Sequence, residues 1–139
     1  MKLILKDNNK YMLRFDRGEE VLACLKEFCA KEGIFAGSFS GLGAAEKITL
    51  MHYDIDTKKY SEKTFSEKLE IASLAGNVAC KDGEIYLHAH GVFSNPSMAA
   101  LAGHVKELTV AATCEMTLET FSGKVEREFS EGIGLNLFK

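Results

Sequence analysis

Several features that would assign this chain to a broad class of proteins are missing from its sequence. No window approaches the 18 or so apolar residues of a membrane-spanning helix. The opening stretch "MKLILKDNNKYMLRF" is too short in apolar residues for the core of a signal peptide. The four cysteines lie far apart without a C-x-x-C pair, which favours reduced, buried thiols over a disulfide framework. We therefore expect a cytoplasmic protein without membrane segments.

An excess of basic charge is also missing. The chain has 17 basic and 20 acidic residues and a formal net charge of −3. A surface that neutralises many phosphates, or that is drawn to an anionic membrane, needs a basic excess. The stretch "DTKKYSEKTFSEK" interleaves lysines with Tyr60 and Phe65, but Asp56, Glu62 and Glu67 cancel most of this charge. Direct DNA binding by this chain alone is therefore not favoured.

The composition that is present predicts one folded domain over residues 1–139. Apolar residues make up 46% of the chain and charged residues 27%, as in folded globular proteins. The stretch "DRGEEVLACLKEFCAKEG" carries apolar residues at helical spacing. Glu19 and Glu20 fall in the expected first turn, where the helix dipole favours acids, and Gly33 is placed to end the helix. This stretch predicts the main helix.

Most of the remaining sequence favours strands. Asp82-Gly83 is a strong signal for a tight hairpin, and the single proline, Pro96, lies in "SNPSMAALAG", where a second, short helix is expected. The fold class is therefore α+β, with a mostly antiparallel β-sheet, one main helix and a short second one. About eight strands are expected, in the stretches "LILKDNNKYMLRF" (two strands), "IFAGSFSGLGAAEKITLMHYD", "KYSEKTF", "KLEIASLAGNVAC", "EIYLHAHGVF", "ELTVAATCEMTLETF" and "KVEREF".

Three of the four histidines lie within "EIYLHAHGVFSNPSMAALAGHV". His88 and His90 are two apart on an expected strand, so both point to one face, about 6.6 Å apart at Cα. Their imidazoles can reach one zinc ion at Zn–N distances of roughly 2.0–2.1 Å, and His104, which follows Gly103, could supply a third ligand. The spacing alone leaves open that the pair is an ordinary polar face. His52 has no neighbouring histidine and is expected to be structural.

The order of these stretches resembles the plant- and prokaryote-conserved (PPC) domain of the bacterial and archaeal type. The resemblance implies an α/β sandwich around a mostly antiparallel sheet, a fold related to acetolactate decarboxylase, and a homotrimer. It also implies that His88, His90 and His104 cluster and bind a metal, most readily zinc. The matching segments are "LRFDRGEEV", "GSFSGLGAAEKITLMHYD", "LEIASLAGNVACKDGE", "YLHAH", "AGHV", "TVAATCEM" and "GIGLNLF".

The resemblance also implies two candidate catalytic residues, Glu115 and Arg14. Glu115 matches a family glutamate and could be a fourth metal ligand or a base acting on metal-bound water, or only a surface carboxylate. Arg14 matches an early family arginine and could clamp a carboxylate, or pair with an acid inside the fold. Where the family has Gly-Gly-His, Ala102 replaces the first glycine, so the shape of the loop over residues 94–103 is in doubt.

Two classes of function follow. Family members are often described as DNA-binding, but the plant proteins carry a basic AT-hook that this chain lacks; its nearest stretch is "DRGEE". The first interpretation is a non-enzymatic, zinc-binding PPC protein with a regulatory role associated with DNA. The alternative is a metal-dependent lyase or hydrolase acting on a small carbonyl or ester substrate, in which Glu115 and Arg14 assist a metal held by the histidines; this rests on analogy of fold.

Overall fold

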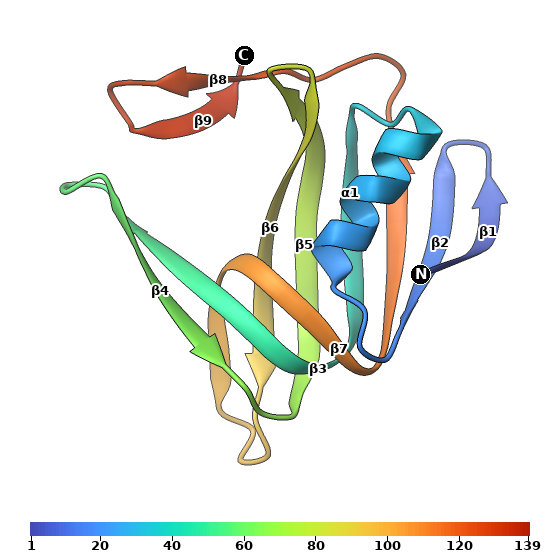
Figure 1. Ribbon diagram of the computed structural model, residues 1–139, viewed down its shortest axis with the longest axis vertical. Helices are drawn as coiled ribbons and strands as arrows, with labels where there is room; N and C mark the ends of the chain where they lie inside the picture. Colours follow the sequence, from blue (N-terminus) through green and yellow to red (C-terminus); the bar gives the residue numbers. More distant parts are fainter.

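The structure, a computed structural model, describes residues 1–139 and is built mainly of β-strands (Figure 1). One helix lies against the long strands, and a small hairpin near the C-terminus stands apart from the main sheet. The elements are β1 (Lys2–Asp7), β2 (Lys10–Asp16), α1 (Val21–Glu32), β3 (Gly37–Asp54), β4 (Lys59–Phe65), β5 (Leu69–Lys81), β6 (Glu84–Ser94), β7 (Ala100–Thr120), β8 (Arg127–Ser130) and β9 (Leu135–Phe138).

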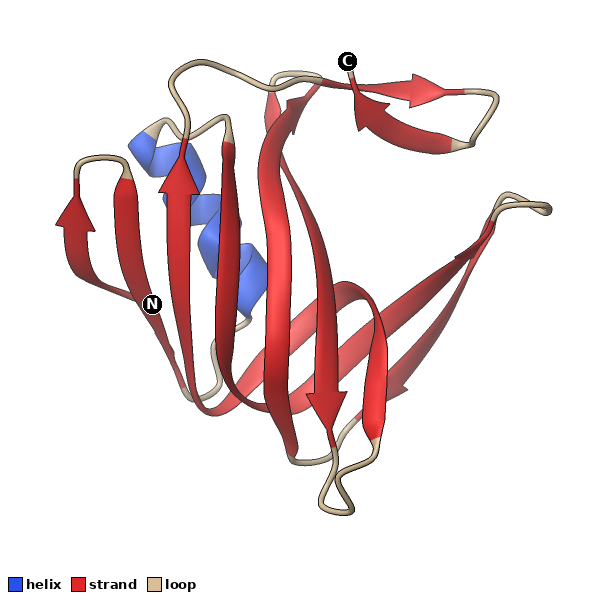
Figure 2. Ribbon diagram, turned by 180° about the vertical axis from the view of Figure 1, so that it is seen from behind, coloured by secondary structure: helices blue, strands red, loops and turns tan.

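Seven strands form one antiparallel sheet in the order β1-β2-β7-β6-β5-β3-β4. Strand β7 also pairs with β3, so β3, β5, β6 and β7 form a closed ring of pairings. Figure 2 shows the two longest strands, β3 and β7, crossing the base of the molecule at a steep angle to the others. The mostly antiparallel sheet with one main helix is as the sequence predicts.

Close backbone approach at Gly43 allows β3 and β7 to bend together. The register between the two strands shifts at Gly43/Ala45, at Ala45/Lys47 and again at Thr49/Leu50. A Cβ atom at Gly43 would collide with the backbone oxygen of Thr113 on β7. Bulges of this kind increase the bend of a strand, so each long strand can pair with one set of neighbours above the bend and another below it.

The helix α1 buries Val21, Leu25, Phe28 and Cys29, which lie at the spacing of one helix face. It ends at Gly33, whose φ of 67° is the left-handed conformation that glycine adopts without strain. At the other end, Glu19 and Glu20 lie just before the helix, not in its first turn as the sequence predicted. Glu20 is the N-cap residue and accepts hydrogen bonds from Leu22 N and Ala23 N, so its carboxylate satisfies helix donors directly.

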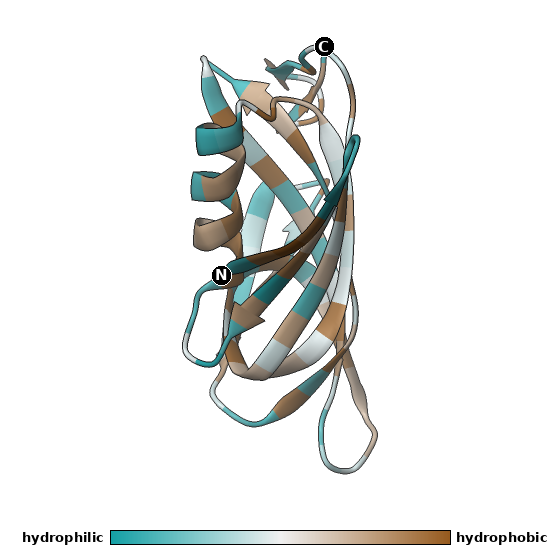
Figure 3. Ribbon diagram, turned by 90° about the vertical axis from the view of Figure 1, so that its right-hand side faces the viewer, coloured by the Kyte–Doolittle hydropathy of each residue, from teal (hydrophilic) through white to brown (hydrophobic).

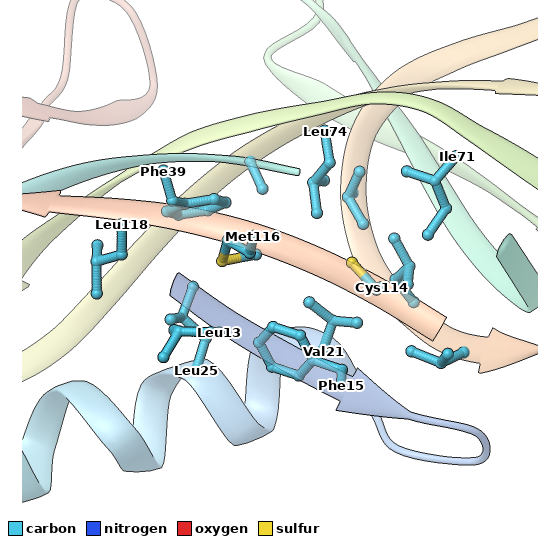
Figure 4. Packing of buried hydrophobic residues seen from close by; sticks show 14 of the residues in the cluster. Leu13, Phe15, Val21, Leu25, Phe39, Ile71, Leu74, Cys114, Met116 and Leu118 are labelled. Atoms are coloured by element: carbon cyan, nitrogen blue, oxygen red, sulfur yellow. The ribbon is translucent and has the colours of Figure 1, made fainter. Parts of the chain in front are cut away.

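The hydrophobic core lies between α1 and the sheet (Figures 3 and 4). In β2 and in the C-terminal part of β7, every second residue points into it, as expected of strands with one buried face. Figure 4 shows these side chains meeting Leu25 and Val21 of the helix side. The strand residues involved are Leu13, Phe15, Cys114, Met116 and Leu118. All four cysteines are free, and burial raises the pKa of Cys29 to about 12.

The second, short helix expected near Pro96 is not formed. Residues 95–99 make a turn in which the Asn95 side-chain oxygen accepts hydrogen bonds from Ser97 N and Ala99 N. These bonds give the backbone an alternative to helical pairing, and β7 begins at Ala100, opposite Ser94 of β6. The Asp82-Gly83 hairpin is confirmed, with φ of 52° and 84°.

The hairpin β8–β9, of which the sequence predicted only the first strand, contacts two parts of the main sheet. Its first end is held to β5 by the hydrogen bond from Cys80 N to Val125 O, at 2.7 Å. Its turn meets the tip of the β3–β4 hairpin, where Tyr53 Oη donates to Ile133 O and Lys58 Nζ to Glu131 O, each at 2.7 Å. Figure 1 shows both hairpins reaching out on the same side of β6. No helix in the structure has the length and apolar character needed to span a bilayer.

Candidate metal centre

Strands β6 and β7 bring the three histidines together. Along β6, Ile85, Ala89 and Phe93 are buried, so His88 and His90 point to the opposite face, as strand alternation predicts. His104 lies directly opposite His90 in the β6–β7 pairing. The turn over residues 95–99 therefore reverses the chain, so that His88 and His90 on β6 lie beside His104 on β7.

The ring nitrogens are close enough to share one ion. The three ligand atoms lie within 4.8 Å of one another, and Nε2 of His88 is 3.2 Å from Nε2 of His90. Two nitrogens held tetrahedrally at zinc would be about 3.3 Å apart, given Zn–N distances of about 2.05 Å. The ring centroids are separated by 5.1, 5.1 and 5.4 Å. The residues present therefore fit a tetrahedral ion with three protein ligands.

Partial burial keeps two of the imidazoles neutral. Burial lowers the pKa of His104 to about 4, with further lowering by His88 and His90. The pKa of His88 is lowered by burial, then by His90 and by the positive charge of Arg127. Neutral imidazole is the form that binds a metal, because its free nitrogen carries the lone pair. At pH 7 these two ligands need lose no proton before binding.

Close backbone packing beside His104 is provided by Gly103. Gly103 pairs with Gly91 of β6, and a Cβ atom at Gly103 would lie 3.1 Å from Met51 O on β3. Ala102, which replaces a family glycine, pairs with Val92 in the same ladder and is exposed. The alanine is thus accommodated in an ordinary strand position, and the three histidines still converge.

Aromatic residues flank the cluster. The Tyr60 ring of β4 lies 5.9 Å from the His104 ring, and the Tyr53 ring lies 4.8 Å from that of Tyr60. Burial raises the pKa of Tyr60, and the nearby phenols of Tyr86 and Tyr53 raise it further. Tyr86, two residues before His88, shares its face of β6. The histidines are therefore bordered by phenols from both β4 and β6.

Arg127 of β8 lies near the cluster and is not among the residues that the sequence predicted for the site. Its guanidinium lies over the Tyr86 ring and bonds to Asn77, which is directly opposite His88 in the β5–β6 pairing. Arg127 is 39 residues after His88 in the chain and sits in a four-residue strand. No local motif connects the two, so only the tertiary fold brings them together.

Glu115 and Arg14 lie elsewhere on the molecule. They are directly opposite each other on β7 and β2 and line a hollow of about 610 Å³ together with apolar side chains such as Leu42. Arg14 also contacts Asp16, with Nε 3.1 Å from Oδ1. Glu115 is eleven residues from His104 on the same strand, a path of about 36 Å when extended. The cluster of possible metal ligands consists of the three histidines and does not include Glu115.

The remaining histidine, His52, is exposed on β3 and pairs with Ser61 of β4, outside the cluster. The free cysteines give no sign of a nucleophile either. Cys114 lies in the core, where burial raises its pKa to about 11, so it stays a thiol at neutral pH. The chemistry that the arrangement offers is therefore concentrated at the three imidazoles.

Fold and site together define a class of protein: a mostly antiparallel sheet with one helix and a tri-histidine cluster on the face away from the core. Residues 5–122 match the family model of the Plants and Prokaryotes Conserved (PCC) domain, also written PPC. The chain belongs to this family. Among curated proteins, no relative matches it.

Solved structures from three organisms resemble the chain over nearly all of its length. A metal-containing protein from Archaeoglobus fulgidus is 33% identical, with a TM-score of 0.90, covering 100% of this chain and 99% of that chain. A PPC protein from Pyrococcus horikoshii is 34% identical, with a TM-score of 0.87 and coverage of 94% and 90%. A protein from Bacteroides thetaiotaomicron, provisionally described as DNA-binding, is 33% identical, with a TM-score of 0.94 and coverage of 97% and 94%.

A more distant likeness concerns the fold alone. Acetolactate decarboxylase from Bacillus subtilis is 14% identical, with a TM-score of 0.58. The match covers 84% of this chain and 54% of the decarboxylase. The predicted kinship of fold is therefore confirmed.

Proposed function

We propose that this protein binds one zinc ion through His88, His90 and His104. The observation that carries the proposal is the convergence of three ring nitrogens within 4.8 Å, two of them at 3.2 Å. Zinc sites with three protein ligands bring imidazole nitrogens together in this way. The Archaeoglobus relative, described as metal-containing, supports the same conclusion.

The donor set favours zinc over the hard cations. Imidazole nitrogen suits zinc and its neighbours in the first transition row, whereas magnesium and calcium select oxygen ligands. Three protein ligands leave a fourth position for water or a ligand, as in catalytic zinc sites. A zinc ion there would act as a Lewis acid and lower the pKa of a bound water towards 7.

The role we propose is binding and regulation by a cytoplasmic homotrimer, without an enzymatic step. The description of the Bacteroides relative as provisionally DNA-binding supports an association with DNA. The net charge of −3 argues that such an association runs through a partner and not through phosphate contacts of this chain.

A second candidate, a metal-dependent lyase or hydrolase for a small carbonyl or ester substrate, is favoured by the open fourth position. In a single chain, Glu115 and Arg14 line a different hollow. Their predicted assistance then depends on a second copy of the chain bringing them to the histidines. Turnover of small keto acids or model esters that a chelator abolishes would move the assignment to this class.

Elemental analysis of the purified protein tests the metal. We expect about one zinc per chain in the wild type and less than a tenth of that in His88→Ala, because two imidazoles rarely hold zinc against dialysis. His52→Ala is the matched control, since it removes an exposed histidine outside the cluster. Equal metal content in wild type and His88→Ala would refute the proposed site.

A further inference from the structure

The guanidinium of Arg127 lies over two aromatic rings near the histidine cluster. Its central carbon lies 4.3 Å from the centre of the Phe138 ring and 5.1 Å from that of Tyr86. Phe138 is directly opposite Arg127 in the β8–β9 hairpin, whereas Tyr86 belongs to β6. Stacking of this kind orients a planar guanidinium and leaves its N–H edge available for polar partners.

The polar partners of Arg127 are neutral. Nη2 donates to Asn77 Oδ1 at 2.8 Å, and Nη1 donates to Asn136 O at 2.6 Å. The neighbouring glutamates are engaged elsewhere, Glu126 by Lys124 and Glu128 by Lys139. A guanidinium has five N–H donors, so one N–H on each Nη remains, while the buried Nε has no partner. A half-buried positive charge without a carboxylate costs free energy that an anionic ligand would recover.

The contacts of Arg127 place this charge near His88. Asn77, its hydrogen-bond partner, is directly opposite His88, and opposed side chains on antiparallel strands have Cβ atoms about 4.5–5.5 Å apart. Tyr86, over which the guanidinium lies, is two residues before His88 on the same face. The hairpin that carries Arg127 is also fixed to the tip of β3–β4 by the bonds of Tyr53 and Lys58.

We propose that Arg127 and the metal-loaded histidines together bind a small carboxylate. This inference rests on the proposed zinc site and names the class of ligand that the site takes. The carboxylate accepts hydrogen bonds from the remaining Nη donors, in the planar fork that arginine offers to carboxylates. A single guanidinium, with no lysine among its contacts, matches a monoanion better than a phosphate dianion. Asn77 acts as a positioning residue that holds the fork towards His88.

The experiment uses cobalt-loaded protein, because cobalt replaces zinc at imidazole sites and its visible absorption reports on ligands. Propionate is the probe and propionamide its neutral control. We expect propionate to change the cobalt spectrum with millimolar affinity, and Arg127→Met to weaken that affinity at least tenfold with cobalt content unchanged. Arg17→Met is the matched control, since Arg17 is another arginine without an ion pair and lies in a hollow with Ala44 and Pro96. It should leave the affinity unchanged.

The outcomes separate the two proposals. If the wild type takes up no cobalt, the zinc site itself fails, and the carboxylate site fails with it. If cobalt binds but propionate does not, or binds Arg127→Met as tightly as the wild type, only the carboxylate site fails. Should Arg127→Met not fold, as judged by circular dichroism, Arg127→Lys keeps the charge but loses the planar fork. Its propionate affinity must still fall several-fold, and an unchanged value would overturn the inference.

Discussion

At the scale of single residues, His104 is a partly buried titratable group with a strongly lowered pKa. Its pKa of about 4 lies well below the ordinary value of 6.5, because burial disfavours the charged imidazolium and His88 and His90 add to the effect. Between about pH 4 and pH 6.5, the His104 imidazole binds a proton in the unfolded chain but not in the folded chain. Folding stability therefore falls as the pH drops through this window.

This difference predicts the pH dependence of the metal-free protein. Its free energy of unfolding, measured with urea, should have its highest value above about pH 6.5 and decline steadily from pH 6.5 towards pH 5. In His104→Asn the decline should be shallower, because one titrating group is gone. Glu19, whose pKa is lowered by the N-terminal amine, titrates below this window and should not obscure the result. Parallel slopes for the two proteins would contradict the assigned environment of His104.

Residue by residue, the site was predictable where the strand pattern applies. His88 and His90 alternate with buried Ala89, so their common direction follows from strand geometry alone. That His104 faces them required the β6–β7 register, which the family resemblance supplied. Arg127 could not be found, because its approach to Tyr86 depends on a hairpin whose position only tertiary contacts determine.

Among the elements, α1 is joined to the sheet by Glu20. Its carboxylate accepts hydrogen bonds from Leu22 N at 3.3 Å and Ala23 N at 2.6 Å, and from Leu108 N of β7 at 2.9 Å. The same side chain therefore caps the helix and satisfies a backbone donor on a buried stretch of the longest strand. Removal of this side chain should therefore destabilise both α1 and β7.

We expect Glu20→Ala to destabilise the protein by about 2–4 kcal/mol, which combines about 1 kcal/mol for a helix cap with 1–3 kcal/mol for an unpaired buried donor. Glu20→Gln should cost less, since its amide oxygen still accepts. Urea unfolding monitored by circular dichroism measures both. Glu27→Ala, at an exposed position of the same helix, is the control and should stay within about 0.5 kcal/mol of the wild type. A comparable loss in the control would show that the cap is not the cause.

The helix and the strands that the sequence predicted correctly are those with a clear local pattern of apolar spacing or turn residues. The helix has apolar residues at regular spacing and a glycine at its end, and the β5–β6 hairpin has Asp82-Gly83 at its turn. The short helix at Pro96 was wrong because Asn95 supplies acceptors that hold a turn instead. Strand β9 was missed because four residues carry too little pattern; pairing with β8 and the bond from Arg127 to Asn136 O hold it in place.

At the scale of the whole molecule, one face of the sheet exposes large apolar side chains. Ile4, Met12 and Leu42 are 57%, 51% and 60% exposed and line the same hollow as Arg14 and Glu115. Their buried neighbours on the same strands face the core, so this apolar surface lies on the side of the sheet away from α1. Contiguous exposed apolar surface of this kind marks an interface between proteins.

We predict that this face forms the contact between copies of a homotrimer. Light scattering after size-exclusion chromatography should give three times the chain mass of 15.3 kDa. Leu42→Glu should shift the protein to the monomer, because it would bury three like charges. Ala30→Glu, on the exposed face of α1, should remain trimeric. A monomeric wild type, or a Leu42→Glu protein that still assembles fully, would exclude this arrangement.

The overall charge bears on the proposed association with DNA. A protein that contacts phosphates directly releases counterions, so its affinity falls steeply with salt. With a net charge of −3 per chain, assembly multiplies the repulsion between protein and DNA. We therefore expect gel-shift titrations at about 50 mM and 150 mM salt to show no complex at micromolar protein with either duplex or single-stranded DNA.

A complex at micromolar protein whose affinity falls at least tenfold between the two salt concentrations would contradict this prediction. It would mean that a local cluster of lysines outweighs the net charge. The first residues to replace would then be Lys58, Lys59 and Lys63, because they lie close together on the β3–β4 hairpin.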